Sequence, residues 1–420
     1  MNRLLRWVGA DEILQQRRRV VDEATLRGAS RIVEDVRARG ELAVREHSER
    51  FGDCDEGDAL RVDRAQLQAA LAALAKSDRE VLERTAARIT AFAEAQRAGL
   101  LPLDTAVPGG RAGHRWLPVA SVGAYAPGGR HPLPSSVLMT VIPARVAGVA
   151  DVVVAAPKPT PITLAAAALA GADSLLAVGG AQAIAALAFG TFAPPTDVIV
   201  GPGNRWVTAA KQLLVGEVGI DGLAGPSELL VVADDSADPA VVAADLLAQA
   251  EHDEDAVPIL VTTSATLRAA VEVELAEQLP LLPTAATAAA ALRGNGVSVQ
   301  VSGIDEAARI ANRFAPEHLE LCVRDADAVR ARFTSYGGLF VGSQSAEVFG
   351  DYGAGPNHVL PTGGGARFQA GLSVMTFLRP LTYLQIENAE HLRADAAHLA
   401  RLEGLEAHAR SAEARSKKAR

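Results

Sequence analysis

The feature that most constrains the fold is an alternation of short apolar runs with turns and helix-forming stretches. Apolar runs at 152–155, 175–178 and 198–200 are each short enough for a strand, and glycine or proline turns separate them. Alanine-rich stretches such as 163–172 lie between the runs. Strands that alternate with helical stretches in this way are typical of parallel βαβ units. The alternation therefore predicts an α/β fold.

The same pattern continues in the second half of the chain, with apolar runs at 229–232 and 258–261. A helix is expected to begin at Pro239, since proline suits the first helical position. Residues 12–96 are charged, helix-patterned and free of proline, and the tail from about residue 394 is also expected to be helical. A chain of 420 residues usually exceeds one hydrophobic core, so we expect two or more domains, although length alone does not exclude a single large barrel.

The charge balance argues against two classes of partner. The chain has 50 acidic and 41 basic residues and a net charge of -9, whereas general binding to nucleic acid or to a membrane surface requires a basic excess. The uncharged stretch 174–196 is interrupted by glycine and proline pairs, which argues against a membrane span. Cys54 and Cys322 are too few for a disulfide framework, and the N-terminus lacks the features of a signal peptide. We therefore expect a cytoplasmic protein.

Glu317 and His318 are adjacent, and we interpret them as a proton-handling pair. The pattern before them predicts an amphipathic helix over 307–314, which Pro316 makes hard to continue. The alternation over 319–323 is typical of a half-buried strand. Both side chains are thus expected at a junction, where they can face one cavity. An arbitrary Glu-His dipeptide is more often a solvated charge beside an ordinary strand-end histidine.

The helix expected after Pro239 carries Asp245, Gln249 and His252 on one stripe, since offsets of four and seven residues return to nearly the same angle. Zinc accepts imidazole nitrogen and carboxylate oxygen, but glutamine is an uncommon ligand. Neither His-Glu-x-x-His nor Cys-x-x-Cys occurs in the chain. The alternative is a helix end with solvated polar groups, so this stripe alone leaves a metal site open.

A second polar cluster, at 350–358, combines closely spaced glycines with Asp351 and His358. Glycines let the backbone pass close to a bound group, and the two side chains offer a ligand and a hydrogen-bonding group. The same pattern fits a tight loop whose polar side chains satisfy its own backbone.

Three glycine turns follow predicted strands, at 125–129, 179–182 and 201–204, and together they indicate a ligand crevice. The last turn precedes a helix-like stretch at 206–214, so backbone N–H groups there can meet a phosphate or another anion. The third glycine of G-x-G-x-x-G and a persuasive acidic partner are both missing. A standard dinucleotide fingerprint is therefore not established.

Taken together, these segments resemble the histidinol dehydrogenases, the enzymes of the last two steps of histidine biosynthesis, over nearly the whole chain. Two of the most specific pieces are Gln249-Ala-Glu-His252 and Ala315-Pro-Glu-His-Leu319. The others lie at 178–190, 201–204, 224–228 and 350–361. Several motifs in the right order carry more weight than any one of them.

The resemblance implies a zinc site and a catalytic pair. Gln249, His252 and Asp351 would ligate one zinc ion per subunit, with His408 as a fourth ligand from the partner subunit of a homodimer. Glu317 and His318 would be catalytic. Tyr125, Gln182 and Asn204 would contact NAD. The residues implied to contact the substrate, L-histidinol, are Ser227, Gln249, His252, His318, Asp351, Glu403 and His408, with His358 as a further candidate.

The chemistry of the family suits these residues. Oxidising a primary alcohol to an acid takes two hydride transfers, with water added to the aldehyde between them. His318 would remove the alcohol proton, Glu317 would polarise the water, and zinc would hold the amino and imidazole nitrogens of histidinol against the nicotinamide. We interpret Cys322 as a packing residue, because it lies roughly 13 Å along an extended strand from His318.

With the resemblance, we expect two incomplete Rossmann-like α/β domains, a helical N-terminal arm and a small C-terminal helical extension that reaches the partner subunit. The expected division places the arm at 1–22, the first α/β domain at 23–124 plus 228–316, the second, NAD-side domain at 125–227 plus 317–375, and the extension at 376–420.

Some features leave alternatives open. Arg130 and His131 depart from the small residues expected of the family after the Tyr125 turn, so another small primary alcohol is an alternative substrate. Glu403 and His408 would lie roughly 140° apart on an ideal helix, unless Gly404 loosens that turn or one residue reaches in from the side. A less favoured alternative is a zinc hydrolase in which Glu317 activates water without a cofactor.

Overall fold

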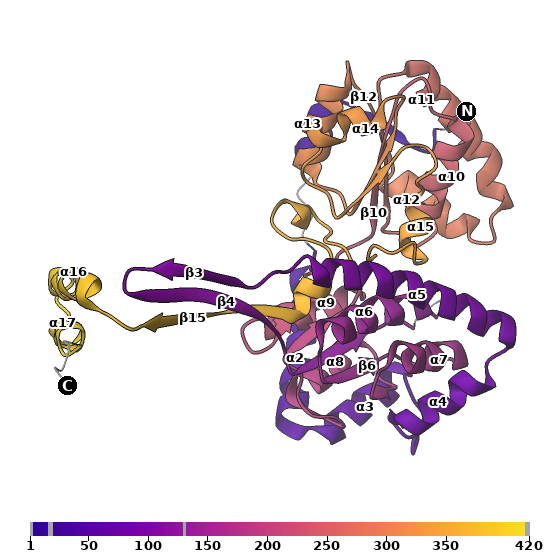
Figure 1. The fold of residues 1–420 in the computed structure, drawn as a ribbon. Coiled ribbons are helices and arrows are strands. Elements are labelled where there is room, and N and C mark those ends of the chain that lie inside the picture. The colour runs from indigo at the N-terminus through magenta and orange to yellow at the C-terminus, as the bar shows by residue number, and fades with distance from the viewer. Residues whose placement is uncertain (1–2, 16–19, 129–131, 416–420) are drawn as a thin grey trace.

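The computed structural model describes residues 3–15, 20–128 and 132–415. They form two α/β bodies and one long arm, which Figure 1 shows extending to the left. We call residues 23–98 and 121–220 the lower body, and residues 6–15 and 228–351 the upper body. The arm comprises residues 103–118 and 378–413. The α/β architecture with parallel sheets confirms the predicted fold class.

The sheet of the lower body is parallel except at one edge, where β2 runs antiparallel to β7. In spatial order its strands are β2 (Arg61–Asp63), β7 (Ser174–Leu176), β6 (Asp151–Ala155), β5 (Ser121–Tyr125), β8 (Val198–Val200) and β9 (Gly219–Ile220). Val152 and Val154 face one apolar layer, whereas Val153 and Ala155 face the other. Because both faces are buried, the inner strands of this sheet are largely apolar after their first residue.

Helices cover both faces of this sheet. One layer contains α4 (Arg64–Ala73), α5 (Lys76–Ala98), α6 (Pro134–Ala147) and α7 (Pro161–Ala170). The other contains α2 (Glu23–Arg39), α3 (Glu41–Phe51), α8 (Gly180–Phe189) and α9 (Arg205–Leu214). The alanine-rich stretch expected to be helical is α7, where alanine allows a close approach to neighbouring helices.

The upper body repeats this plan with a fully parallel sheet. Its strands, in spatial order, are β1 (Arg6–Val8), β12 (Val297–Gln300), β11 (Val257–Thr262), β10 (Glu228–Ala233), β13 (His318–Cys322) and β14 (Gly338–Val341). One face is covered by α10 (Pro239–Ala250), α11 (Ala265–Gln278) and α12 (Ala285–Gly294). The other is covered by α1 (Ala10–Gln15), α13 (Ile304–Phe314) and α14 (Ala326–Val329), and α15 (Glu347–Asp351) follows β14.

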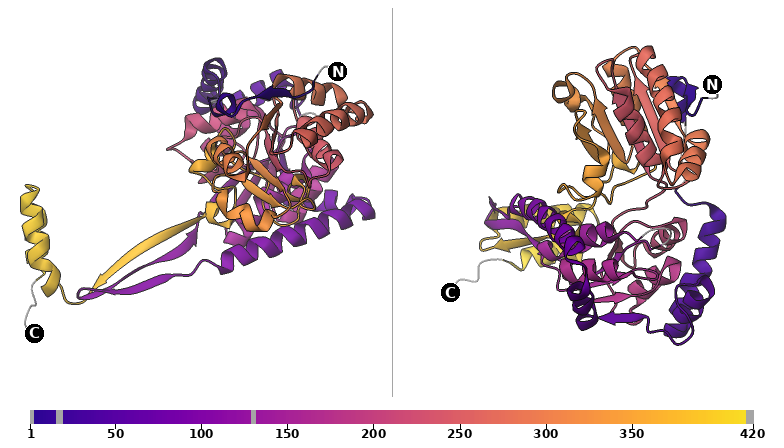
Figure 2. Two further views of the ribbon diagram at one scale, coloured as in Figure 1. Left: turned by 90° about the horizontal axis from the view of Figure 1, so that it is seen from above. Right: turned by 90° about the vertical axis from the view of Figure 1, so that its right-hand side faces the viewer.

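The arm is an antiparallel sheet that leads to a helical tip (Figure 2). Its strands are β15 (Leu378–Ile386), β4 (Gly110–Pro118) and β3 (Leu103–Val107), and the tip consists of α16 (Glu390–Leu402) and α17 (Glu406–Glu413). The C-terminal extension therefore begins with a strand before the expected helices. None of the helices in the described ranges is long and apolar enough to cross a membrane.

The strand pairings divide the chain differently from the expected interleaved domains. β5 pairs with β6 and β8, so residues 121–124 belong with 151–220 and not with 228–316. β13 pairs with β10, so its residues belong with 228–316 and not with 125–227. Short connections place successive βα units side by side, which favours two sheets that are nearly continuous in sequence. The N-terminal segment also adds the strand β1 to the upper sheet.

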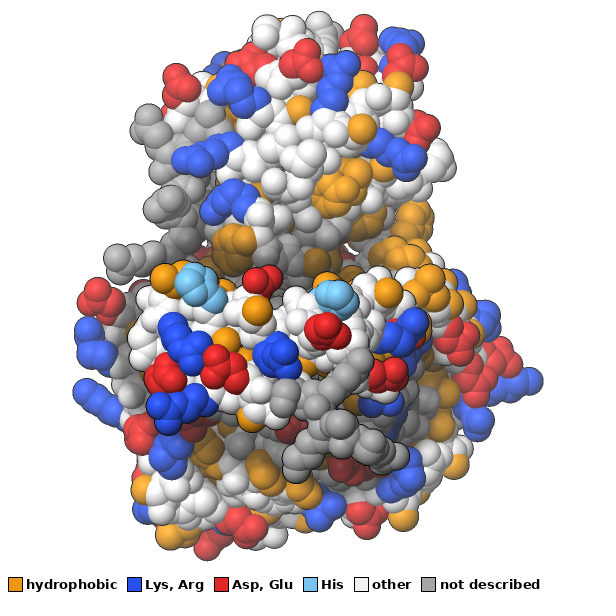
Figure 3. Space-filling model, turned by 60° about the vertical axis from the view of Figure 1, so that its left-hand side comes forward, with side chains coloured by type: hydrophobic (Ala, Val, Ile, Leu, Met, Phe, Trp, Pro, Cys, Tyr) orange, Lys and Arg blue, Asp and Glu red, His pale blue; other side chains and the backbone are white. Residues whose placement is uncertain are grey.

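The two bodies meet at a waist, where the ends of their strands and helices face each other. Several hydrophobic side chains lie along this waist (Figure 3). Tyr125 ends β5 of the lower sheet, whereas Glu228 and His318 begin β10 and β13 of the upper sheet. A large cavity at the waist is lined by Tyr125 and by His252, which follows α10. Residues from strand ends of one body thus face residues from helix and strand ends of the other.

Gly28 provides a test of the packing that supports this edge. A Cβ at Gly28 on α2 would lie 2.6 Å from Cζ3 of Trp206 on α9. Gly28→Ala should therefore lower the free energy of unfolding by about 1–3 kcal/mol, measured by chemical denaturation. Gly294→Ala on α12 is the control, because a Cβ there meets nothing within 4 Å. Equal stability of Gly28→Ala and the unsubstituted protein would contradict this packing.

Candidate active site

Glu317 and His318 lie at a sharp junction between α13 and β13, as predicted. α13 ends at Phe314, and Ala315 takes a left-handed conformation with a φ of 54° before Pro316. β13 begins at His318 and is buried along its whole length. The predicted half-buried alternation is therefore wrong, because β13 lies between β10 and β14 with helices on both faces of the sheet.

The ring of His318 is oriented as a neutral base. Its Nδ1 lies 3.1 Å from the carbonyl oxygen of Glu228, which assigns the ring proton to Nδ1. Its Nε2 is buried and has no hydrogen-bond partner among the described residues. Burial lowers the pKa of His318 to about 4. The unshared electron pair of Nε2 is therefore available to accept a proton.

Glu317 is held by two donors on one oxygen. Its Oε2 accepts hydrogen bonds from Ser227 Oγ at 2.8 Å and from the backbone N–H of Glu228 at 3.0 Å. Burial raises the pKa of Glu317 to about 8, and this effect exceeds the lowering by the two hydrogen bonds. A carboxyl group that titrates near neutral pH can both accept and return a proton.

Gln249 and His252 lie at the end of α10 and carry atoms that can bind a metal. Gln249 is completely buried, yet neither its amide oxygen nor its amide nitrogen has a partner in the described part of the chain. His252 Nδ1 lies 2.9 Å from the carbonyl oxygen of Ala248, so Nε2 faces Asp351 Oδ2 at 3.6 Å. Metal-binding histidines are commonly oriented in this way by a backbone carbonyl.

The charges of this pair are strongly linked. Asp351 raises the pKa of His252 to about 9. Burial acts to raise the pKa of Asp351, but His252, His318 and His358 together keep it below its usual value. Nearby positive charge therefore stabilises the carboxylate of Asp351. A bound divalent cation would stabilise it in the same way.

Two overlapping sets of donors are candidates to hold a metal, and both contain Asp351. In the first set Asp351 joins Gln249 and His252. In the second it joins His318 and Glu347, with all three donor atoms within 4.8 Å of one another. A metal held by the first set would give the buried amide of Gln249 a partner and would leave Nε2 of His318 free as a base. Its imidazole nitrogen and carboxylate and amide oxygens suit zinc, so the predicted residues fit that ion.

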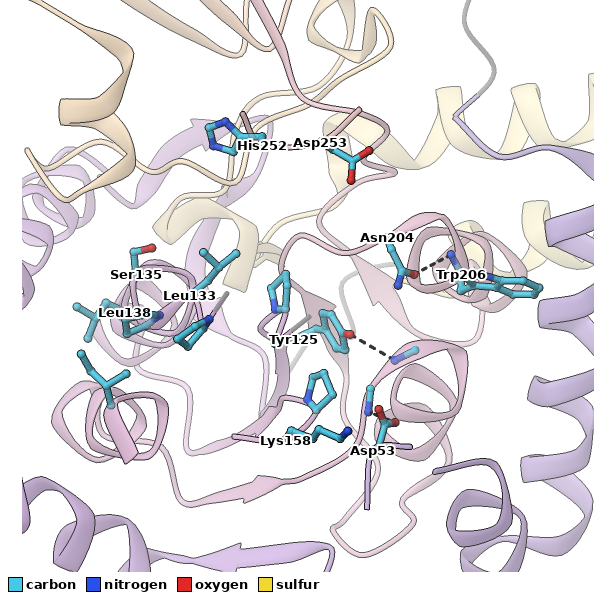
Figure 4. A pocket seen from close by; sticks show the side chains of 18 of the residues that line it. Asp53, Tyr125, Leu133, Ser135, Leu138, Lys158, Asn204, Trp206, His252 and Asp253 are labelled. Carbon is cyan, nitrogen blue, oxygen red and sulfur yellow. Dashed lines mark hydrogen bonds between the residues drawn. The ribbon is translucent and has the colours of Figure 1, made fainter. Parts of the chain in front are cut away.

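A cavity of about 1270 Å³ adjoins His252 and opens between the two bodies. Tyr125, Gln182 and Asn204, the predicted cofactor residues, all line it. Figure 4 shows His252 on the upper side of the cavity and Tyr125 and Asn204 on the lower side. Ligand pockets usually measure roughly 300–1,000 Å³, so this cavity has room for a dinucleotide.

The glycine turns below the cavity are fixed by hydrogen bonds. Tyr125 Oη accepts a hydrogen bond from the backbone N–H of Gly180 at 3.3 Å. Lys211 Nζ donates to the carbonyl oxygen of Gly201 and to Asp221 Oδ1, both at 2.6 Å. Asn204 Oδ1 caps α9 by accepting from two backbone N–H groups. The turns are thus held in place without a complete G-x-G-x-x-G pattern.

The other predicted residues are distributed between the site and the arm. His358 joins the site, with Nδ1 3.0 Å from the carbonyl oxygen of Asp351. Glu403 and His408 lie at the tip of the arm, and Figure 1 shows α16 and α17 far from α10, the helix that His252 follows. A break at Gly404, with a φ of 76°, separates α16 from α17, so the angle expected on one continuous helix does not apply.

The predictions for Cys322 and for the Arg130-His131 segment have different outcomes. Cys322 is buried, and burial raises the pKa of its thiol to about 12, which agrees with a packing residue. Arg130 and His131 lie outside the described residues.

Comparison with known proteins identifies the family. The family model described as histidinol dehydrogenase matches residues 15–416. A histidinol dehydrogenase of Ruegeria pomeroyi is 48% identical over 396 residues, which cover 91% of this chain and 90% of that protein. The chain belongs to the histidinol dehydrogenase family.

Other histidinol dehydrogenases agree in sequence and in fold. That of Parasynechococcus marenigrum is 46% identical over 388 residues, covering 90% of this chain and 88% of its own length. The crystal structure of the Elizabethkingia anophelis histidinol dehydrogenase matches with a TM-score of 0.92 at 31% identity and covers 99% of this chain and 98% of that chain. The likeness therefore extends over both bodies and the arm.

The motifs shared with histidinol dehydrogenases did not identify a group of carboxyls behind His318. Glu347 Oε1 lies 3.4 Å from His318 Nδ1, and the backbone N–H of Glu347 donates to Glu320 Oε1 at 2.7 Å. Burial raises the pKa of Glu347, of Glu320 and of Asp245, and their mutual repulsion adds to the effect on Glu320 and Glu347. The stripe on α10 pointed to Asp245, but no periodic signal marked Glu347.

Glu320 provides a test of these protonation states. Burial raises its pKa from 4.5 to about 8, so its favourable contribution to stability is complete below about pH 4.5 and is lost as the pH rises through about 8. Glu320→Gln cannot ionise but keeps an acceptor for Glu347. The variant should therefore gain stability relative to the unsubstituted protein between about pH 5 and 9, measured by urea unfolding.

A matched control for this prediction is Glu94→Gln, which changes an exposed carboxyl on α5. It changes an exposed surface residue and should alter the free energy of unfolding by no more than about 0.5 kcal/mol. If Glu320→Gln and Glu94→Gln gave the same dependence, the raised pKa of Glu320 would be refuted.

Proposed function

We propose that this protein is a zinc- and NAD-dependent histidinol dehydrogenase, which oxidises L-histidinol through histidinal to L-histidine with two molecules of NAD. The observation that carries the proposal is the free Nε2 of His318 beside the facing pair of His252 and Asp351. That combination offers a base and a cation site within a few ångströms of each other, next to a cavity of dinucleotide size. Its place in metabolism would be the last two steps of histidine biosynthesis.

His318 is the proposed base for the alcohol. The alcohol must lose its hydroxyl proton as a hydride leaves the carbon, because the product of this first step is a neutral aldehyde. The bond from Nδ1 to the Glu228 carbonyl holds the ring, and Nε2 takes the proton. The low pKa of the free ring favours rapid release of that proton afterwards.

Glu317 is the proposed base for water. Hydration of the aldehyde needs a proton removed from the attacking water, and a carboxylate that titrates near neutral pH can take it. Ser227 Oγ and the Glu228 N–H hold one oxygen of Glu317, which leaves Oε1 for the water. The hydrate would then lose a second hydride, which NAD would accept, and a hydroxyl proton, which a base of the site would take, and so become the carboxylic acid.

Gln249, His252 and Asp351 are the residues that would hold zinc. When bound, zinc would fix the amino and imidazole nitrogens of the substrate and so orient the reacting carbon. Tyr125, Gln182 and Asn204 would hold NAD, which accepts the hydride in each step. Ser227 and His358 are proposed to contact the substrate because both are bonded to groups of the site.

The decisive experiment combines L-histidinol, NAD and the zinc-loaded protein, with NADH followed by its absorbance. We expect two NADH for each histidinol consumed, loss of activity with a chelator, and recovery with zinc. His318→Ala should lower kcat by about 10²–10⁴-fold while the zinc content, measured by elemental analysis, is unchanged.

The control for that variant is His47→Ala, because His47 binds Asp35 within the lower body and does not line the large cavity. It should retain full turnover. Absence of NADH formation by zinc-loaded protein would contradict the proposal, and faster oxidation of a different primary alcohol would assign that alcohol as the substrate. Full turnover by His318→Ala would show that His318 is not the base.

We further infer that two copies of the chain form a homodimer in which each arm completes the partner's site. The tip buries only Ala397, Ala400 and Ala409 against each other, whereas Leu399 and Leu402 are 58% and 71% exposed. Such a tip gains stability by packing on another surface. Glu403 and His408 would then contact the substrate bound by the partner subunit. His408 would also supply the fourth ligand of that subunit's zinc.

Mixing two inactive variants tests the exchange of arms. His318→Ala and His408→Ala chains are each expected to be inactive. In a mixed dimer, the His408→Ala body meets an intact arm and forms one complete site, so random reassociation should restore about a quarter of the full activity. The measurement is NADH formation after joint refolding. No recovery above either variant alone would show that His408 acts within its own chain.

A further inference from the structure

Asp53 lies at the end of the large cavity that is remote from His252. It follows α3, and it reaches the glycine turn after β7 from far away in sequence. Its Oδ2 accepts hydrogen bonds from the backbone N–H of Gly179 at 2.9 Å and from Gln182 Nε2 at 3.0 Å. Both bonds end on the same oxygen. Oδ1 has no hydrogen-bond partner among the described residues.

Asp53 lies where two cavities meet. The large cavity and a smaller one of about 500 Å³ share Gly52, Asp53 and Lys158. Figure 4 shows Asp53 and Lys158 on the opposite side of the large cavity from His252, with Tyr125 between them. A dinucleotide whose nicotinamide is beside His252 would therefore have its adenosine half near Asp53.

The chemistry of this half distinguishes two cofactors. NAD has a hydroxyl at the 2′ position of the adenosine ribose, and NADP has a phosphate there. In dinucleotide-binding folds a carboxylate accepts a hydrogen bond from that hydroxyl and repels the phosphate. The three glycine turns lack such a carboxylate in their own sequence, and the fold brings Asp53 to one of them.

We propose that Asp53 is a specificity-determining residue that binds the adenosine ribose and selects NAD over NADP. The inference rests on the proposed use of NAD. Oδ2 fixes the carboxylate to the turn, and Oδ1 accepts from the ribose hydroxyl. Burial raises the pKa of Asp53, and the positive charge of Lys158, which lines both cavities beside it, acts against that rise and so favours the carboxylate form. The discrimination is assigned to Asp53.

Asp53→Asn is the informative variant. Its amide oxygen can still accept from Gly179 and Gln182, so the turn keeps its bonds while the negative charge and the free acceptor are lost. The ratio of kcat/KM for NAD to kcat/KM for NADP, with L-histidinol as substrate, should fall about ten- to a hundredfold, the usual effect of a hydrogen bond to a charged group. Calorimetry should show a matching rise in the Kd for NADH relative to NADPH.

Asp55→Asn is the matched control. Asp55 has the same charge and lies on the same loop, but it is exposed and lines only the smaller cavity. It should leave the ratio unchanged, and thermal unfolding should show that both variants are folded. A ratio in Asp53→Asn within twofold of that of the unsubstituted protein would overturn the proposal, as would an equal fall in Asp55→Asn.

These outcomes are separable from failure of the proposed function. If the unsubstituted protein bound NADH but did not oxidise histidinol, calorimetry of NADH and NADPH would still test Asp53. If it bound neither cofactor, both proposals would be overturned. A protein that oxidises histidinol with equal use of NAD and NADP would refute only the role of Asp53.

Discussion

The arrangement of the molecule depends on the need to bury both faces of two parallel sheets. Helices cover each face, so polar side chains cannot reach solvent from the middle of a strand without disrupting a core. The ends of the strands are where polar groups can gather. The active-site candidates accordingly lie where strand and helix ends of the two bodies meet, and His318 is the first residue of its strand. Chemistry at this edge requires the two bodies to be held together, because the cavity takes residues from both.

Burial has opposite effects on the two members of the proposed catalytic pair. Desolvation disfavours the charged form of any group, so it lowers the pKa of His318 and raises that of Glu317. Glu317 and His318 are thereby both biased towards their neutral forms. The histidines around Asp351 work in the other direction and stabilise its charge. A single buried region thus contains one stable carboxylate and, beside it, groups that exchange protons easily.

Much of the fold could be predicted from local patterns, whereas the contacts around His318 could not. The apolar runs predicted the strands β6, β7 and β8, and the shared motifs pointed to Gln249, His252 and Asp351, which the structure brings to one region. The pairing of β10 with β13 joins residues 89 positions apart, and it alone brings the Glu228 carbonyl to His318. Glu347 and Asp53 acquire their neighbours in the same way. The expected domain division was wrong for this reason too, since local periodicity identifies a strand but not its neighbour in the sheet.

The small core of the arm's tip has a consequence for motion. Ala397, Ala400 and Ala409 are its buried apolar residues, and alanine contributes little apolar area. A helix pair of this kind opens locally far more easily than the sheets do, unless another surface covers it. In the proposed homodimer, the partner would cover this tip, so amide hydrogen exchange at α16 and α17 should depend on protein concentration, while exchange in β10 and β13 should not. The protection of the arm from amide exchange would then measure the fraction of the protein that is associated.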